Sequence, residues 1–302
     1  MNVYLNGQIV PAERATVSVF DRGYLMGDGV YEGLRSFRGR THSVGHHVER
    51  FRFGLGQAGI VWDPELLEPL TDELLAANGI ADAFIYWQVT RGVPGPGQPL
   101  RTRVPAGPMT PTVFGFCAAQ AAIEAFETVP TVTAATVEDC RWLRARLKST
   151  SLLGNILGAI EAAEAGAKEA LMVRDGLVAE GSATNVILAL PTPDGRTELV
   201  TPSLDSVPIL AGVTRARVLE LDPSIRERAV REEELDLASE IILVGTTALV
   251  TSVTQLNGRP VGGGRAGPEA RRLLGLFVGM IRDELGLDSM TVELAPGAPQ
   301  AI

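Results

Sequence analysis

Hydrophobic and polar residues along the first part of the chain predict a mixture of strands and helices. Residues 3–5 and 8–10 flank an Asn-Gly pair that suits a type I′ turn, so they are expected to form a hairpin. Apolar residues recur at helical spacing over 48–58 and 64–78. β-branched and aromatic residues predict strands over the following ranges: 30–37, 41–44, 83–93 and 112–117.

The second half is also dominated by strands, which alternate only irregularly with helices. Strands are expected at 131–137, 170–173, 177–179, 185–190, 198–200 and 241–244, and helices at 152–165, 210–221 and 268–285. The helix at 152–165 would carry its large apolar residues on one face: Leu152, Leu153, Ile156, Leu157 and Ile160. Without strict alternation of strand and helix, an α+β fold is favoured over a doubly wound sheet.

An alanine-rich stretch with weak periodicity separates the two halves. Residues 119–128 are therefore the predicted linker, with an N-terminal domain over 1–118 and a larger domain over 129–302.

Composition excludes several classes of partner. A net charge of −9 and a pI near 5.0 predict no basic face, which argues against nucleic acid. The N-terminus has no signal-peptide pattern, and no apolar run approaches the roughly 20 residues of a membrane span. Two isolated cysteines favour a reducing cytoplasm. His42, His46 and His47 have no metal-ligand spacing, so we expect surface or helix-terminal roles and no metal site.

The basic residues are almost all arginines: of 27, only Lys148 and Lys168 are lysines. An amine can lose its proton and form a Schiff base with an aldehyde, whereas a guanidinium stays charged. Lys168 lies in a polar turn and is expected to be exposed. Lys148 lies in an irregular junction between a strand and an apolar helix, which makes it the candidate for chemistry.

Three further features complement Lys148, although each also has an ordinary structural explanation. Glu180 ends a predicted strand, Gly212-Val213-Thr214 opens a helix, and Gly245-Thr246-Thr247 ends a strand. These features match the requirements of pyridoxal 5′-phosphate (PLP). PLP needs a lysine for its aldehyde, a carboxylate for its pyridinium nitrogen, and two sets of N–H and hydroxyl groups for its phosphate. No dinucleotide or ATP fingerprint competes with this interpretation.

The chain resembles the fold-type IV (class IV) PLP-dependent aminotransferases, and most closely the bacterial D-amino acid transaminases. The matching segments occur in family order along nearly the whole chain: residues 21–32 (DRGYLMGDGVYE), 47–51 (HVERF), 85–92 (IYWQVTRG), 138–144 (EDCRWLR), Lys148-Ser149, Glu180-Gly181-Ser182, 212–215 (GVTR) and Thr246-Thr247. The resemblance implies a small α/β domain, a larger domain with a pseudo-barrel of strands, and PLP in the cleft between them. It also implies a homodimer.

By this resemblance Lys148 is similar to the lysine that carries PLP, and Glu180 to the carboxylate that bonds the pyridine nitrogen. Arg50 is similar to the arginine on the phosphate, and Arg141 to an arginine near the cofactor. The remaining cofactor positions match Leu210, Val213, Thr214 and Thr246.

The resemblance is less complete for the substrate-binding residues than for the cofactor-binding ones. Tyr31 matches the family tyrosine beside the substrate, and Tyr86 stands where branched-chain L-enzymes carry an arginine. Pro96 and Gln98 replace the Arg and His with which D-amino acid transaminases hold the α-carboxylate. The other candidate substrate-binding residues are Thr247, Arg35, Arg101 and Arg103.

The function that the resemblance implies is ping-pong transamination between a D-amino acid and a 2-oxo acid, of the D-alanine/2-oxoglutarate type. The Glu32-Gly33-Leu34-Arg35 segment resembles the branched-chain enzymes. An L-branched-chain or (R)-amine transaminase is therefore the alternative, followed by a 4-amino-4-deoxychorismate lyase. A PLP carrier without turnover is disfavoured because both Lys148 and Glu180 are retained.

Overall fold

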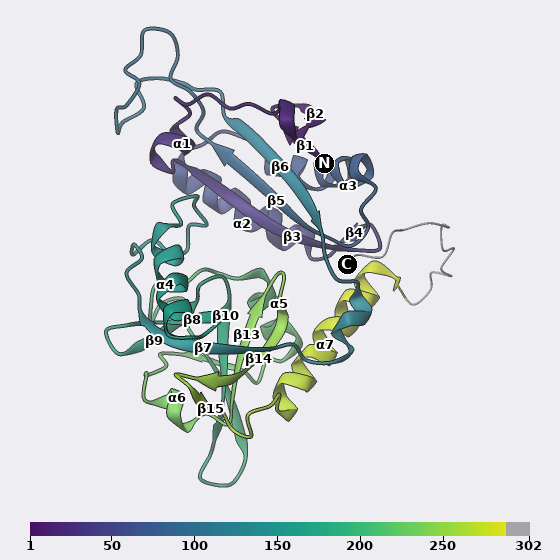
Figure 1. The fold of residues 1–302 in the computed structure, drawn as a ribbon, viewed down its shortest axis with the longest axis vertical. Coiled ribbons are helices and arrows are strands. Elements are labelled where there is room, and N and C mark those ends of the chain that lie inside the picture. The colour runs from purple at the N-terminus through teal and green to yellow at the C-terminus, as the bar shows by residue number, and fades with distance from the viewer. Residues whose placement is uncertain (288–302) are drawn as a thin grey trace.

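Each half of the chain forms its own β-sheet, and the computed structural model describes residues 1–287 (Figure 1). The first half contains β1 (Asn2–Leu5), β2 (Gln8–Pro11), α1 (Arg22–Met26), β3 (Gly29–Phe37), β4 (Arg40–Thr41), α2 (Val44–Ala58), α3 (Leu67–Asn78), β5 (Ala83–Thr90) and β6 (Thr112–Ala119). Three short 3₁₀ helices lie at Ala12–Arg14, Pro64–Leu66 and Ile123–Glu127.

The second half contains the larger sheet and the remaining helices of residues 1–287. Its elements are β7 (Thr131–Glu138), α4 (Leu153–Glu164), β8 (Glu169–Arg174), β9 (Leu177–Gly181), β10 (Asn185–Pro191), β11 (Thr197–Pro202), α5 (Val213–Leu221), β12 (Arg226–Arg228), α6 (Glu234–Leu237), β13 (Glu240–Gly245), β14 (Leu249–Leu256), β15 (Arg259–Pro260) and α7 (Pro268–Leu285).

The first sheet is antiparallel, with strand order β2-β1-β6-β5-β3-β4. Helices α2 and α3 pack on one face, where Leu34, Ile85 and Trp87 are buried with residues of both helices. Because side chains alternate along a strand, Tyr31 and Gly33 lie on the opposite face of β3. That face is the one that contributes to the pocket described below.

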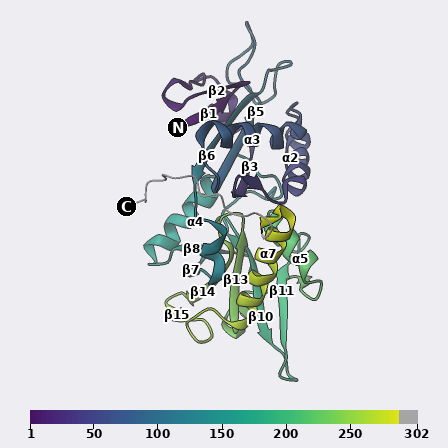
Figure 2. The same ribbon diagram turned by 90° about the vertical axis from the view of Figure 1, so that its right-hand side faces the viewer.

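The second sheet is mixed and curls on itself. Its order is β12-β11-β10-β13-β14-β7-β8-β9, with β15 paired to β14. β9 also contacts β10 and β11, which closes the curl around buried aliphatic residues such as Leu188 and Leu243. Helices α5 and α7 pack outside it, around Phe277 (Figure 2). This arrangement agrees with the predicted α+β fold.

The end of α7 joins the two halves. Arg38 donates from Nη1 to the Leu287 carbonyl at 3.1 Å, and Arg40 donates to the Leu285 carbonyl. Both arginines lie at the β3–β4 turn, so their charges meet carbonyl groups at a helix C-terminus, where cations are stabilising. Ile123 of the expected linker is buried in the α7 core. The division at 1–118 and 129–302 itself stays a prediction.

Most predicted elements are present, with several differences. Residues 41–44 do not form one strand: β4 ends at Thr41 and α2 already begins at Val44. The helix expected from Leu210 begins at Val213. Strand β14 was missed, although it lies in the middle of the larger sheet between β13 and β7.

The histidines are less exposed than predicted. The side chains of His42 and His47 are both 1% exposed, and only His46 reaches the surface, beside Glu220. Burial, with the nearby charges of His47 and Arg35, lowers the pKa of His42 to about 3. His42 therefore serves as a neutral core residue packed between Phe37 and an aromatic residue of α7.

The apolar face of α4 is also exposed, although such a stripe usually faces a core. The exposed fractions are 67% for Leu153, 51% for Ile156, 49% for Leu157 and 48% for Ile160. The buried positions of α4 are instead the small residues Gly158 and Ala162.

Three features bear on compartment and ligands. No helix within residues 1–287 combines the length and hydropathy that crossing a bilayer requires. Cys117 is buried and Cys140 exposed, and both are free thiols. Over the same residues, His, Cys, Asp and Glu side chains nowhere group in threes as metal ligands.

Candidate active site

Lys148 lies at the junction of the two halves. Its segment has no regular structure, and its backbone carbonyl accepts a hydrogen bond from Tyr31 N at 3.0 Å, while Ser149 forms a β-bridge with Val30. These contacts tie the lysine to β3. Its Nζ lies 4.1 Å from the centroid of the Tyr31 ring, so the aromatic face holds the amine in place. Lys168 is exposed, as predicted.

Glu180 is a buried carboxylate at the end of β9. Its oxygens accept hydrogen bonds from Arg141 Nη1, from Asn185 Nδ2 at 2.9 Å and from the Leu210 backbone N–H at 3.1 Å. These donors fix its orientation. Burial nevertheless dominates and raises the pKa of Glu180 to about 7, against the opposing effect of Arg141.

Arg141 is held by two acids. Asp139 accepts from its Nε at 2.8 Å and from its Nη2 at 3.0 Å, and Glu180 accepts from Nη1. Asp139 therefore fixes the guanidinium that in turn orients Glu180. Burial alone would raise the pKa of Asp139, but the hydrogen bonds and charge of Arg141 lower it.

Arg50 of α2 forms an ion pair with Glu32, a carboxylate of β3. Glu32, which is 0% exposed, accepts from Arg50 Nε at 2.7 Å and Nη2 at 2.6 Å, and from His47 Nδ1 at 2.9 Å. Burial alone would raise the pKa of Glu32, but the Arg50 charge and hydrogen bonds bring it down to about 2. Arg50 Nη1 reaches the Ala211 carbonyl, next to the start of α5.

Two backbone turns provide hydrogen-bond donors beside these groups. The first N–H groups of α5, at Val213 and Thr214, have no acceptor within their own helix. Gly212 precedes them and allows a close approach, because a Cβ there would lie 1.9 Å from Asn185 Oδ1. The turn that contains Thr246 and Thr247 follows β13. Both turns suit an anion.

A single pocket of about 450 Å³ brings most of the predicted residues together. Its lining includes Tyr31, Arg50, Arg141, Lys148, Glu180, Leu210, Val213, Thr214, Thr246 and Thr247. These residues come from both halves of the chain, so the pocket lies between the two sheets. Their individual roles stay predictions.

Four candidate substrate residues lie outside that lining. Arg35 is 1% exposed and donates to the Ala121 carbonyl, and Tyr86 lies behind Tyr31 with ring centroids 5.5 Å apart. Arg101 and Arg103 are exposed in the segment between β5 and β6. None of the four therefore contacts this pocket within one chain.

Sequence reasoning gave no role to Glu32, Asp139 or Asn185, which hold the residues of the pocket. Only Glu32 left a signal, as a carboxylate among the apolar residues of a predicted strand. Asp139 acts through Arg141, whose hydrogen bond to Glu180 spans 39 residues of sequence, and Asn185 turns back to Glu180 across a loop. Local patterns reveal neither contact.

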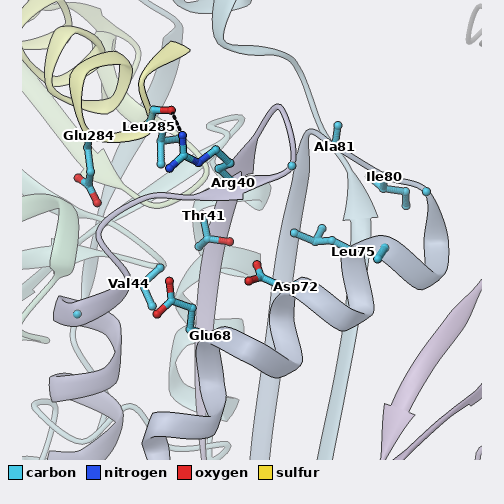
Figure 3. Close-up of a pocket in the computed structure, with 14 residues that line it drawn as sticks. Arg40, Thr41, Val44, Glu68, Asp72, Leu75, Ile80, Ala81, Glu284 and Leu285 are labelled. Carbon is cyan, nitrogen blue, oxygen red and sulfur yellow. Dashed lines mark hydrogen bonds between the residues drawn. The ribbon is translucent and has the colours of Figure 1, made fainter. Parts of the chain in front are cut away.

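A larger recess of about 750 Å³ lies elsewhere, between α3, the β4 turn and the end of α7 (Figure 3). Its acidic residues are Glu68, Asp72 and Glu284. It contains neither lysine nor the backbone turns of the first pocket, so we place the chemistry in the first.

The arrangement in the first pocket suits a phosphorylated aldehyde. An amine lies beside an aromatic face, an oriented carboxylate has a pKa near neutrality, and free N–H groups lie at a helix N-terminus. Together these groups can bind an anion, couple an aldehyde and hold a proton on a ring nitrogen.

Comparisons with known proteins agree with this chemistry. The family model for amino-transferase class IV matches residues 29–256. The chain is 35% identical to a D-alanine aminotransferase of Bacillus licheniformis over 89% of this chain and 93% of that protein. It is also 35% identical to the D-alanine aminotransferase of Staphylococcus haemolyticus over 90% of this chain and 94% of that one.

Solved structures show the same architecture. A branched-chain aminotransferase of Thermoproteus uzoniensis with norvaline has a TM-score of 0.80 and 27% identity, covering 96% of each chain. A second branched-chain amino acid aminotransferase, complexed with N-(5′-phosphopyridoxyl)-L-glutamate, has a TM-score of 0.81 and 26% identity, covering 94% of each chain. With a family model that spans most of its length and relatives above 30% identity, this chain belongs to the class IV aminotransferases.

Proposed function

We propose that this protein transfers amino groups between a D-amino acid and a 2-oxo acid, with Lys148 as the catalytic residue. The observation that carries the proposal is the placement of the Lys148 amine and the buried Glu180 carboxylate in one pocket with the N-terminus of α5. The D-alanine aminotransferases, at 34–35% identity, support the D-amino acid.

The residues present fit PLP, on which class IV aminotransferases depend. The α5 N-terminus and the Thr246 turn would hold the phosphate, with Arg50 beside them. Gly212 supports this arrangement, since a side chain there would displace Asn185, the amide that bonds Glu180 beside the start of α5. Leu210 would pack on the ring, and Glu180 would face its nitrogen.

When bound, PLP supplies an aldehyde that couples to amines and a ring that withdraws the electrons released at the substrate Cα. The Lys148 amine removes the Cα proton and later returns a proton, as a positioned general base and acid. Tyr31 keeps that amine in the pocket. Burial raises the pKa of Glu180 to about 7, so this group can exchange a proton near neutral pH, and as a carboxylate it would keep the ring nitrogen protonated. Arg141 and Asn185 keep the carboxyl group aligned.

The α-carboxylate of the substrate needs donors of its own. Thr247 and its neighbouring backbone N–H groups line the pocket, and we propose that they bind this carboxylate. Both arginines of the lining are already ion-paired, whereas the Thr247 turn offers donors that none of these ion pairs occupies.

A panel of amino donors tests the proposed function. We expect 2-oxo acid formation from D-alanine with a 2-oxo acid acceptor and ping-pong kinetics. L-Leucine and (R)-1-phenylethylamine are the matched alternatives. Faster transfer from either of them than from D-alanine would contradict the D-amino acid assignment and favour the corresponding transaminase.

The branched-chain alternative has specific support from the two solved branched-chain enzymes that share this fold. The Glu32-Gly33-Leu34-Arg35 segment also resembles that group. However, Tyr86 stands at the position where branched-chain enzymes carry an arginine, and its hydroxyl donates a hydrogen bond to Gln88 Oε1 at 2.8 Å. The D-amino acid assignment is therefore preferred.

We further propose that the protein is a homodimer. The exposed residues Leu153, Ile156, Leu157 and Ile160 make an apolar face on α4. Trp142 and Leu143, at 46% and 72% exposure, lie in the segment just before the lysine. Contiguous exposed apolar surface of this kind marks an interface. A second copy on this face would also shield the mouth of the pocket, since Trp142 contributes to its lining.

Replacing Ile156 by glutamate should separate the dimer, because it places a charge in an apolar contact. We expect the mass in light scattering to fall from twice the 32.1 kDa chain mass to that of one chain. Leu237→Glu is the control, because Leu237 is also exposed, at 65%, but lies on α6. An unchanged mass for Ile156→Glu would contradict this interface.

A further inference from the structure

The side of the pocket formed by the first sheet is aromatic, and its shape depends on one glycine. Tyr31 and Phe84 line the pocket with Gly33 between them, and we call these three residues the aromatic wall. A Cβ on Gly33 would lie 2.8 Å from Phe84 Cε2 and 3.1 Å from Cζ. The ring therefore covers Gly33, and a side chain at residue 33 would force the ring to move.

Neighbouring aromatic rings on the same sheet face pack against this wall. Phe84 packs edge-on against Phe116 with ring centroids 6.5 Å apart, and Tyr86 stacks on Phe116 at 5.2 Å and on Tyr31 at 5.5 Å. Each contact lies within the range of favourable aromatic pairs. The wall is therefore supported by a continuous set of rings on one sheet face.

The lysine lies next to this wall. The amine that removes the Cα proton lies on the face of Tyr31. A substituent of Cα that extends along the same strand face meets Gly33 next, and then the Phe84 ring.

Charge in the pocket disfavours an acidic side chain. Arg50 is ion-paired with Glu32, and Arg141 with Asp139 and Glu180. Glu169 adds a further carboxylate to the lining. A second carboxylate on the substrate would therefore meet no unpaired guanidinium among the described residues of this lining, and would lose its hydration.

We infer that the aromatic wall selects amino donors with bulky apolar side chains, aromatic ones above all, over acidic donors. This inference rests on the proposed function and names its substrate class. Phe84 is the residue that sets the preference, and Gly33 is required because it admits the Phe84 ring.

The test compares kcat/KM of the PLP-loaded enzyme for D-phenylalanine, D-leucine, D-alanine and D-glutamate, with 2-oxobutanoate as acceptor, because it is not the oxo acid of any of these donors. We expect D-phenylalanine to exceed D-glutamate by at least about tenfold, a discrimination within reach of pocket contacts. An equal or higher value for D-glutamate would overturn the inference while leaving the transaminase assignment intact. If only L-amino acids react, the D-assignment fails, and the same ratio measured on the L-series still decides the role of the wall.

Variants locate the preference in the wall. Phe84→Ala should lower the ratio of kcat/KM for D-phenylalanine to that for D-alanine by about tenfold, mainly through KM for D-phenylalanine. Phe114→Ala is the matched control, because this ring lies on the same sheet face but outside the pocket lining, and the ratio should not change. Phe84→Leu keeps apolar bulk and provides a folded alternative, with an intermediate ratio. A ratio that responds equally to Phe84→Ala and Phe114→Ala would overturn the role of Phe84.

Discussion

Replacing Lys148 by alanine is expected to abolish transamination. The substitution removes both the amine that couples to the cofactor and the base that moves the Cα proton. We expect kcat to fall by at least about 10⁴-fold, the upper end of what a positioned acid–base group contributes. Lys148→Arg should be equally inactive, since a guanidinium stays charged at neutral pH. Steady-state assays with D-alanine measure the loss.

The second lysine of the chain provides the control. Lys168 is exposed beyond the end of α4, so Lys168→Ala should retain wild-type kcat and cofactor content. Normal turnover by Lys148→Ala, or a comparable loss in Lys168→Ala, would contradict the assignment of Lys148.

Replacing Glu180 by glutamine is expected to produce the second largest loss. The amide keeps the size of the side chain but can neither carry the charge nor supply the proton for the ring nitrogen. We expect kcat to fall about 10²- to 10³-fold, as when one preorganised electrostatic partner is lost. Leu210→Ala, which leaves Glu180 intact, should lower cofactor affinity more than kcat. Wild-type kcat in Glu180→Gln would exclude an electrostatic role for this residue.

The raised pKa of Glu180 also predicts how the cofactor-free protein responds to pH. Folding raises this pKa from an ordinary 4.5 to about 7, so the folded state binds the proton more tightly. The contribution to stability is complete below pH 4.5 and is lost as pH rises through about 7. The slope for one such group approaches about 1.4 kcal/mol per pH unit. Urea unfolding at several pH values should show a shallower slope between pH 5 and 7 for Glu180→Gln. Parallel curves for the two proteins would contradict burial as the cause of the shift.

The sequence predicted the elements whose signal is local. The hairpin at the start follows from its Asn-Gly turn, and α7 has the predicted bounds because Pro268 and Gly286 mark its ends. β14 was missed because Leu249–Leu256 mixes threonine, serine and glutamine with apolar residues. Its place between two strands of the larger sheet, rather than its own pattern, makes it a central strand.

Tertiary contacts decided which predicted faces are buried. The stripe on α4 was correctly identified as apolar, but small residues on its other side pack against the sheet, so the stripe remains exposed. Similarly, a surface or helix-terminal role was expected for His42, which is buried between aromatic rings of β3 and α7. Neither result follows from spacing along one element.

Pocket residues could be predicted only at the positions that match the family's motifs. Lys148 and Glu180 were identified from sequence and lie in one pocket. The residues that orient them, such as Asp139, come from side-chain contacts that only the fold creates. The substrate side was the weakest part, because Arg35 lies against the linker carbonyl of Ala121 rather than in the pocket.

Direct identification of the lysine that carries the cofactor tests the central claim most clearly. Protein incubated with PLP would be reduced with borohydride, which makes the bond permanent, then digested and mapped by mass spectrometry. A single phosphopyridoxyl group on Lys148 is the predicted result. Labelling of Lys168 or the N-terminal amine instead, or no stable labelling at all, would contradict it.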